Sequence, residues 1–400
     1  MMNRRAFLTT AAAALAPAGR APAQEPAPIP DIIKSLKPML DGIQPITEDE
    51  RRARVEKARR LMRENKMGAI YLEPGTSLYY YTGKRGVDAG AGLVLAAKGE
   101  AAWISPEKSG SETEGPYRRI AQALKDRGAA AGRVGLEERV RFAVFDGLRK
   151  QMPALELVAA DPVTAGCRVI KSPAELALMQ RASDITIACY KAVFATLHQG
   201  MTQRELSGNV AAAYRALGVR GDAMAIFGKY TAFPHGSIEP QQLREGDMVL
   251  VDDGCTVEGY QSDITRTTVF GKPTKRQREI WDLERKAQDA ALAAAKPGAT
   301  CESVDAAARK VITDFGFGPG YKVPGLPHRT GHGIGLDGHE WTYLVRGNKT
   351  RLEPGMCFSD EPTIAIYGEF GVRLEDCMYI TENGARMFSK QSPAIDRPFG

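Results

Sequence analysis

The sequence predicts an α+β protein of two domains, a smaller α/β domain followed by a larger domain of helices and β-hairpins. Between residues 47 and 165, short β-like runs alternate with helix-like segments, which is typical of a compact α/β unit. Between residues 166 and 395, long helix-like segments precede hairpins that begin near Met248. The length of 400 residues is ample for two well-buried cores.

The first 23 residues differ in kind from the rest of the chain. Arg4 and Arg5 precede an alanine-rich run of low hydrophobicity, and Ala21-Pro22-Ala23 has the small-x-small pattern of a cleavage site. The segment resembles a twin-arginine export signal, so we expect an exported, periplasmic protein that is cleaved after Ala23. A disordered tail with a chance Arg-Arg pair is the alternative. Residues 24–46 are proline-rich and predict a linker with one short helix near residues 32–40.

The first domain begins at a helix start signal. Thr47 and Glu50 have the spacing of a capping box, and the apolar residues that follow fall on one face of a helix. Strands are then expected at 69–72, 78–81, 92–96, 101–104 and 134–136, with helices near 117–127 and 142–150. The domain is expected to end near Pro162.

The second domain opens with Ser172 as a cap and Pro173 in the first helical turn, which predicts a long helix that ends near His198. Further helices are expected at 202–217, 275–295 and 301–315. No uncharged apolar run reaches the roughly 18 residues that a membrane-spanning helix needs. We therefore expect no integral membrane segment once the signal is removed.

The net charge and the cysteine spacing argue against several classes of protein. Three arginines of the expected signal account for half of the formal charge of +6, which argues against a nucleic-acid partner. The six cysteines are widely spaced and form no C-x-x-C pair, so a zinc knuckle and a thioredoxin-like motif are excluded. We expect buried free thiols, although an oxidising compartment permits disulfides.

Two acids flank the first predicted hairpin. Asp252 ends an apolar strand and Asp263 lies 11 residues later, a spacing that suits neighbouring positions on antiparallel strands. Buried carboxylates are costly unless a positive charge compensates them, and a divalent cation can do so. Arg266 is an alternative partner, and the hairpin alone does not decide between the two.

Two more acids flank a second predicted hairpin. Glu361 and Glu375 are equidistant from Gly368, which lies in a turn-like stretch, so they are expected to face each other across the hairpin. Like charges in this arrangement repel unless a cation lies between them. Arg373 can supply part of that compensation.

Histidines complete the candidate site. Four of the five lie beside glycine, proline or carboxylates, and three of them share the segment 327–340: His328, His332 and His339. The glycines of this segment lack both the Lys-Ser/Thr ending and the G-x-G-x-x-G order of phosphate-binding loops. Carboxylates with one imidazole suit manganese, cobalt or zinc in a two-metal site better than one tetrahedral structural zinc. His198, near a helix end, is assigned no role.

The order of these motifs resembles a known family. D-x-G, S-D-x-T-R-T, P-H-R-T-G-H-G-I-G-L-x-x-H-E, E-P and G-x-R-x-E-D are similar to the pita-bread metallopeptidases, which include Xaa-Pro aminopeptidase, prolidase and methionine aminopeptidase. The resemblance covers residues 171–390, and the first domain resembles the creatinase-type N-terminal domain of the proline-specific branch. It implies a creatinase-type α/β domain followed by a pita-bread catalytic domain.

The resemblance also implies a ligand set. Two divalent metal ions are expected, manganese first, with cobalt or zinc as alternatives. Asp252 chelates one ion, His332 and Glu361 chelate the other, and Asp263 and Glu375 bridge both. A hydroxide held between the ions is expected to attack the scissile carbonyl. Glu361 is the implied proton acceptor.

Further residues are implied on the substrate side. His235 and His339 are expected to act in catalysis by binding the peptide and the developing oxyanion. His328 helps define the proline pocket, and Arg373 holds the bridging glutamate or a substrate carboxylate. Two departures from the pattern are the acid pair Asp252-Asp253 and Thr363, which stands where glycine is common. Neither removes a ligand, and Asp253 points to the opposite face of an extended strand.

The expected function is hydrolysis of the peptide bond that precedes proline, on peptides with proline at the second position. The additional N-terminal domain and the export signal argue against methionine aminopeptidase. A creatinase-like hydrolase lacks the acidic cage, and a silent peptide-binding module on the same fold usually loses ligands, whereas all five ligands are present here. We also expect a homodimer. The choice between an aminopeptidase and a dipeptidase is left open.

Overall fold

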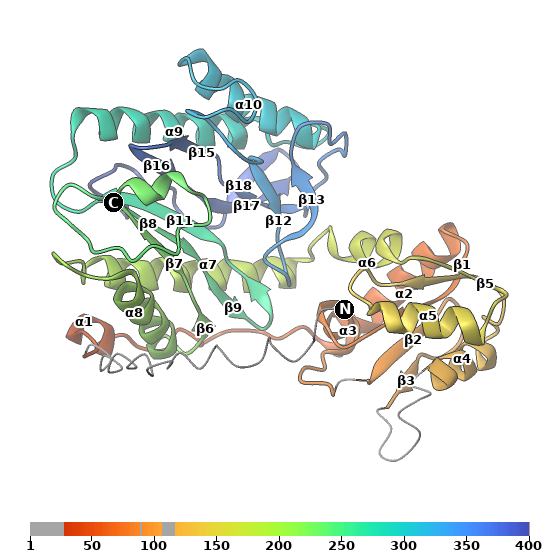
Figure 1. Ribbon diagram of the computed structural model, residues 1–400. Coiled ribbons are helices and arrows are strands. Elements are labelled where there is room, and N and C mark those ends of the chain that lie inside the picture. The colour runs from red at the N-terminus through yellow and green to blue at the C-terminus, as the bar shows by residue number, and fades with distance from the viewer. Residues whose placement is uncertain (1–27, 89, 106–116, 400) are drawn as a thin grey trace, which may run out of the picture.

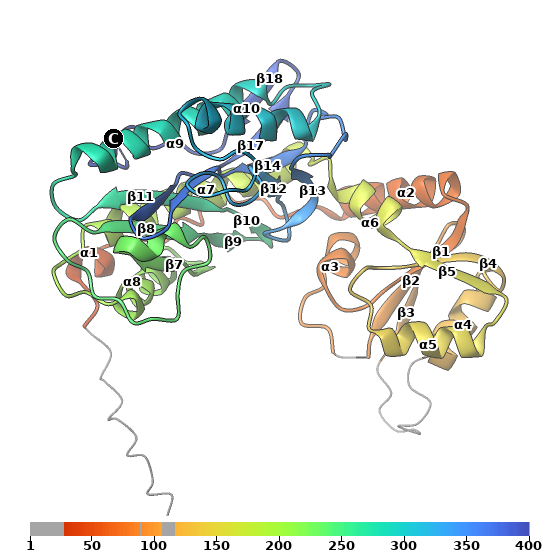
Figure 2. The same ribbon diagram turned by 45° about the horizontal axis from the view of Figure 1, so that its top comes forward.

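The computed structural model describes residues 28–88, 90–105 and 117–399, so the expected export signal at residues 1–23 lies outside the described residues. Two domains are visible, joined at the start of the long helix α7 (Figure 1). Before the first domain, the helix α1 (Asp31–Lys34) lies beside α8 of the second domain (Figures 1 and 2). The helix expected near residues 32–40 is therefore only one turn long.

The first domain is a five-stranded sheet of order β3-β2-β1-β4-β5, covered by helices on both faces. Helices α4 and α5 pack on one face, and α2 and α6 lie on the other (Figure 2). Its elements are α2 (Glu48–Glu64), β1 (Met67–Leu72), α3 (Thr76–Thr82), β2 (Gly92–Ala96), β3 (Ala102–Ile104), α4 (Tyr117–Asp126), β4 (Gly132–Leu136), α5 (Phe142–Gln151), β5 (Leu155–Ala159) and α6 (Asp161–Arg168).

One predicted strand of this domain is wrong. Residues 78–81 were expected to be extended, but they belong to the helix α3, which packs against α2. A run of four apolar residues does not distinguish a buried strand from a buried helical turn. Gly83 ends this helix with a left-handed backbone (φ 68°), a conformation that glycine adopts without a steric penalty. The helix α6 also continues past Pro162, which lies in its first turn.

The second domain holds its sheets between two helical layers (Figures 1 and 2). One layer is α7 (Pro173–Phe194) with α8 (Gln203–Ala216), and the other is α9 (Lys275–Ala294) with α10 (Cys301–Asp314). Between them lie β6 (Arg220–Gly221), β7 (Met224–Phe227), the 3₁₀ helix η1 (Gly228–Ala232), β8 (Met248–Asp253), β9 (Cys255–Val257), β10 (Tyr260–Gln261), β11 (Ile264–Val269), β12 (Gly331–Gly333), β13 (Glu340–Leu344), β14 (Cys357–Asp360), β15 (Thr363–Ile366), β16 (Phe370–Arg373), β17 (Asp376–Thr381) and β18 (Gly384–Met387).

Helix starts follow the capping signals in the sequence. At α7, Oγ of Ser172 accepts from the backbone N–H of Glu175 at 3.3 Å, and the Glu175 carboxylate accepts from the backbone N–H of Ser172 at 2.9 Å. This closes the expected capping box. At α2 only half of the box forms, because Thr47 caps the helix while the Glu50 carboxylate contacts Arg54 and Ser172.

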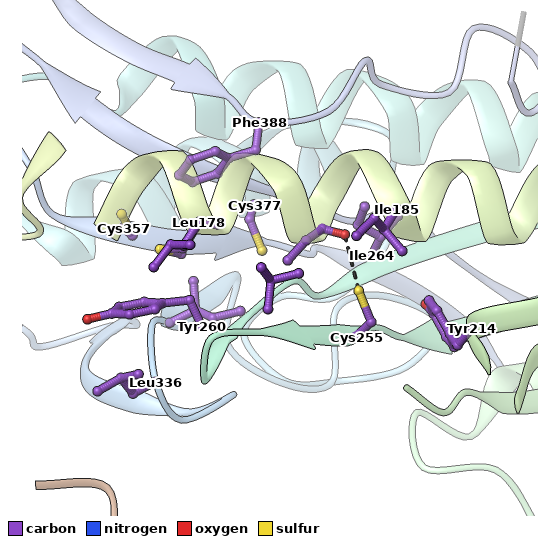
Figure 3. Close-up of a cluster of buried hydrophobic side chains, with 14 of the residues drawn as sticks. Leu178, Ile185, Tyr214, Cys255, Tyr260, Ile264, Leu336, Cys357, Cys377 and Phe388 are labelled. Carbon is purple, nitrogen blue, oxygen red and sulfur yellow. Dashed lines mark hydrogen bonds between the residues drawn. The ribbon is translucent and has the colours of Figure 1, made fainter. Parts of the chain in front are cut away.

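The buried core runs from the first domain into the second. In Figure 3, Leu178 and Ile185 of α7 lie over Cys255, Tyr260 and Ile264 from the strands beneath. The same apolar cluster contains residues of α2 and β1. The two domains therefore pack against each other through a common core.

A buried hydrogen-bond network crosses the same boundary. Arg54 of α2 donates to the hydroxyl of Tyr260 at 3.0 Å, and that hydroxyl donates to Glu175 of α7 at 2.7 Å. Arg54 also donates to the carbonyl of Tyr80 at 3.0 Å. Because unpaired buried polar groups are costly, this network favours one relative arrangement of the two domains.

The cysteine prediction is confirmed. All six cysteines, Cys167, Cys189, Cys255, Cys301, Cys357 and Cys377, are buried free thiols. Among the residues that the structure describes, we found no helix with the length and apolar character needed to cross a membrane.

Candidate active site

The first hairpin brings two of the predicted ligands together. Strands β8 and β11 pair antiparallel with Asp252 opposite Thr265, and Asp263 lies directly before β11. Residues 252 and 263 therefore lie at the same end of one hairpin, as expected. Both strands are buried except at this end of β8, where Asp252 and Asp253 are partly exposed or exposed, so the acids mark where the hairpin reaches the site.

The second pair of predicted ligands is also placed by strand register. Thr363 pairs with Arg373 across β15 and β16, and Asp360 pairs with Asp376 across β14 and β17. Both pairings are centred on Gly368, so the symmetry expected for this hairpin is confirmed. Glu361 and Glu375 occupy the short connections between these paired segments, and both carboxylates enter the same site.

Three of the five predicted ligands form a compact group. Donor atoms of Asp263, His332 and Glu375 all lie within 4.8 Å of one another. Nε2 of His332 lies 3.6 Å from Oδ2 of Asp263 and 3.2 Å from Oε1 of Glu361. Glu361 thus contacts the same imidazole although it lies outside the compact group. His332 lies in β12, whereas Asp263, Glu361 and Glu375 each come from a different connection between strands.

Asp252 joins the group through a threonine. Oγ1 of Thr265 lies 2.5 Å from Oδ1 of Asp252 and 2.7 Å from Oε2 of Glu375. Arg373 forms an ion pair with Asp252, and its Nε donates to Oγ1 of Thr265 at 3.1 Å. The structure therefore brings all five predicted ligands into one buried cluster, with Asp252 held beside Arg373.

Arg373 alone does not compensate the negative charge of this cluster. Burial first, and then the neighbouring carboxylates, raise the pKa values of Asp263 and Glu375 well above their usual range. Burial also opposes ionisation of Asp252, but Arg373 and Thr265 outweigh it and lower the pKa of this carboxyl. Oε1 of Glu375 is buried without a hydrogen-bond partner among the described residues. Divalent cations fit this set of oxygen donors and would compensate its charge.

The tautomer of His332 suits metal binding. Burial lowers the pKa of His332 to about 4, so the ring is neutral near neutral pH. Nδ1 lies 3.0 Å from the carbonyl oxygen of Gly333, so it carries the proton and donates. The lone pair of Nε2 then points to Asp263 and Glu361, as a metal-ligating histidine requires.

The other predicted histidines lie around this cluster in different environments. The ring of His339 stacks on His332 with centroids 3.8 Å apart, and burial lowers its pKa to about 4. His328 lies 2.6 Å from the carbonyl oxygen of Arg329 through Nδ1 and 2.9 Å from Oγ1 of Thr363 through Nε2. His235 is exposed at the rim.

The two arginines near the hairpins have different partners. Arg266 was the rival partner for the hairpin acids, but it pairs with Asp376 at 2.7 Å, where both side chains are fully buried. Arg373 was expected to hold Glu375 or a substrate carboxylate. Its side chain is buried and contacts Asp252, Thr265 and the carbonyl of Pro234, and its charge also acts on Glu375.

Thr265 is a site residue that sequence reasoning missed. It lies within the S-D-I-T-R-T motif and directly opposite Asp252 in the strand register. Extending the hairpin pairing from the turn would have found it, because the register alone places it beside the ligand.

Comparison with known proteins decides the family. A family model described as metallopeptidase family M24 matches residues 177–382, more than half of the chain. The chain belongs to metallopeptidase family M24. Residues 54–170 match the Creatinase/Prolidase N-terminal domain, so this M24 metallopeptidase combines a creatinase-type domain with a pita-bread catalytic domain, as the motifs predicted.

Individual relatives match this M24 metallopeptidase along most of their length. The chain is 31% identical over 350 residues to an Xaa-Pro dipeptidase of Pyrococcus furiosus, which covers 84% of this chain and 97% of the relative. It is 32% identical over 366 residues to an Xaa-Pro dipeptidase of Lactobacillus delbrueckii subsp. lactis, covering 85% and 98%. A dipeptidase structure from Mycobacterium ulcerans superposes with a TM-score of 0.81 at 30% identity, covering 88% and 99%.

Proposed function

We propose that this M24 metallopeptidase hydrolyses the peptide bond that precedes proline, in peptides with proline at the second position. The observation that carries the proposal is the buried cluster of four carboxylates and one neutral histidine, which matches the ligand order expected for the proline-specific branch. The relatives named Xaa-Pro dipeptidase support the same substrate class.

The five ligands suit two divalent ions. We propose that Asp252 holds one ion, that His332 and Glu361 hold the other, and that Asp263 and Glu375 bridge them. When bound, two such ions lower the pKa of a water molecule, polarise the scissile carbonyl and stabilise negative charge on its oxygen. Manganese is the ion we propose first, with cobalt and zinc as alternatives, because a mixed set of carboxylates and one imidazole accepts all three.

The chain's own groups position the substrate and move protons. The Glu361 carboxylate, 3.2 Å from His332 and 3.1 Å from Oγ of Ser359, is proposed as the proton acceptor. His339 is neutral near neutral pH, so its N–H can donate to the developing oxyanion. His235 lies exposed at the rim, where it is free to contact a peptide.

Arg373 has a positioning role in this proposal. It fixes Asp252 and Thr265, and its Nη1 donates to the carbonyl of Pro234 at 3.0 Å. The residue after Pro234 is His235. Arg373 therefore connects the orientation of one metal ligand to the orientation of the rim histidine.

Hydrolysis of an Xaa-Pro dipeptide and of an Xaa-Pro-Yaa tripeptide tests the proposal. Each is assayed after chelation and again after addition of manganese or cobalt. We expect cleavage before proline only when metal is present, and the freed N-terminal amino acid can be quantified directly. Absence of metal-dependent cleavage of both peptides contradicts the proposal, and a creatinase-like or silent protein would give that outcome.

We further propose that the protein is exported to the periplasm and acts as a homodimer. The arginine pair and the alanine-rich run before Ala23 motivate the first proposal. Fractionation of cells that express the full chain should place it in the periplasm, whereas Arg4→Lys with Arg5→Lys should retain it in the cytoplasm. Light scattering of the purified protein tests the dimer, and a monomeric mass would contradict it.

A further inference from the structure

A cavity with a volume of about 770 Å³ lies between the two domains. One wall comes from the second domain, through His339, Trp341 and Tyr343. The other wall comes from the ends of β4 and β5 and from α6 of the first domain. Sites for drug-sized ligands commonly have volumes of about 300–1,000 Å³, so the space suits an extended ligand.

This cavity adjoins the candidate active site through β13. The strand pairs with β12, and Tyr343 lies opposite the ligand His332. His339 directly precedes β13 and stacks on His332 with ring centroids 3.8 Å apart. A peptide whose scissile bond lies at the metal ligands can therefore extend past His339 into the cavity.

The second-domain wall is aromatic. Trp341 and Tyr343 are two residues apart on β13 and so share one face of the strand. Trp341 lines the cavity and is 51% exposed, and Arg329 lies over the ring of Tyr343 at 4.5 Å. An exposed tryptophan face in a cavity offers a stacking surface for a peptide backbone or a cationic side chain.

The cavity is held open by an ion-pair cluster. Arg168 of α6 pairs with Asp337 at 2.7 Å and also with Glu340. Lys171 pairs with Glu340 at 2.8 Å, and Thr76 donates to Asp337 at 2.7 Å. These contacts fix the first domain against the segment that carries His339. The cavity is therefore already formed before a ligand binds.

The first-domain wall has surplus negative charge. Glu137, Glu138 and Asp161 line it, whereas its two arginines are already paired, Arg133 with Glu156 at 3.3 Å and Arg168 with Asp337 and Glu340. Glu138 contacts Arg139 only at 3.8 Å, between two side chains that are about two thirds exposed. Burial raises the pKa of Glu137 even though Ser77 and Arg168 act in the opposite direction, so Arg168 compensates this carboxyl only in part. A basic group in the cavity would add to this compensation.

We propose that the interdomain cavity binds the part of a peptide substrate that follows the proline, and that it favours a basic residue there. The inference rests on the proposed Xaa-Pro hydrolysis and specifies its substrate class, namely peptides longer than dipeptides with a basic tail. Trp341 stacks on the tail, and Glu137 with Glu138 attracts its positive charge.

Three peptides test the inference: Ala-Pro, Ala-Pro-Lys-Ala and Ala-Pro-Glu-Ala, each with manganese. We expect kcat/KM to be highest for the lysine peptide, by about three- to tenfold over the glutamate peptide, because partly screened charge interactions have this size. Glu137→Gln combined with Glu138→Gln should bring that ratio close to one. Trp341→Ala should lower the ratio of the lysine peptide to the dipeptide by about tenfold, the size expected for one lost aromatic contact.

Two matched variants serve as controls. Trp103→Ala removes another partly exposed tryptophan, and Glu64→Gln removes an exposed carboxylate of α2; neither residue lines the cavity. Both should leave the two ratios unchanged, and thermal melting checks that every variant folds. Equal rates for the three peptides, or ratios that the cavity variants do not change, overturn this inference alone. Failure to cleave any of the three peptides contradicts the proposed function as well.

Discussion

Oγ1 of Thr265 lies 2.7 Å from Oε2 of Glu375, and the same oxygen lies 2.5 Å from Oδ1 of Asp252. A single hydroxyl therefore orients a proposed chelating carboxylate and a proposed bridging carboxylate from two different hairpins. Thr265 is fully buried, so water cannot replace this contact.

Replacement of this hydroxyl should weaken metal binding. We expect Thr265→Val to lower the affinity for manganese by about 10- to 100-fold, which is the usual cost of losing a group that orients a metal ligand. Calorimetric titration of the metal-free protein measures this. Thr268→Val is the matched control, because Thr268 lies on the same strand and donates to the carbonyl of Ile395, away from the ligands. Equal affinities in the two variants would refute the orienting role.

Thr363 should act on catalysis through His328. Its hydroxyl lies 2.9 Å from Nε2 of His328, whose Nδ1 already donates to the carbonyl of Arg329. Thr363 therefore donates and locks the ring. A hydrogen bond of this kind contributes about 1 kcal/mol, so Thr363→Val should lower kcat/KM for an Xaa-Pro dipeptide by about three- to tenfold. Thr363→Ser keeps the hydroxyl and should retain the activity. Equal loss in both variants would point to packing instead.

The ion pair at Glu340 should make stability depend on pH. Burial alone opposes ionisation of Glu340, but Lys171 and Arg168 outweigh burial and lower the pKa to about 2 from an ordinary value of 4.5. Folding therefore releases a proton between these values, and the stabilisation is present above 4.5 and lost as the pH falls toward 2.

Urea denaturation of wild type and Glu340→Gln checks this expectation. The difference in free energy of unfolding should be largest above pH 4.5 and should shrink as the pH falls toward 2. Glu382→Gln removes an exposed carboxylate between β17 and β18 and controls for the general effect of charge. A difference for Glu340→Gln that stays constant across this range would contradict the ion-pair account.

Local signals in the sequence were enough for most of the fold. Capping residues and apolar periodicity predicted α7, α8, α9 and α10 to within a few residues, because each long helix has a start signal and one apolar face. The exception at 78–81 is a short apolar run whose side chains are buried in either conformation.

The candidate site was predictable where strand register determines it. Pairing about Gly368 placed Glu361 and Glu375, and the hairpin spacing placed Asp252 near Asp263. The arginine partners were not predictable in this way. Arg373 pairs with Asp252 although the two are 121 residues apart, and Arg266 pairs with Asp376 at a separation of 110. Such pairs depend on how separate hairpins pack, which no local spacing encodes.

Metal content and Xaa-Pro hydrolysis, measured together in three variants, test the central claim most directly. The claim is that the carboxylate cluster binds two divalent ions that drive cleavage before proline. Asp263→Ala and Glu375→Ala should each abolish turnover and reduce the bound manganese below two ions per chain, because each removes a bridge. Asp314→Ala, an exposed acid at the end of α10, should keep both properties. Retained turnover in either bridging variant would contradict the account.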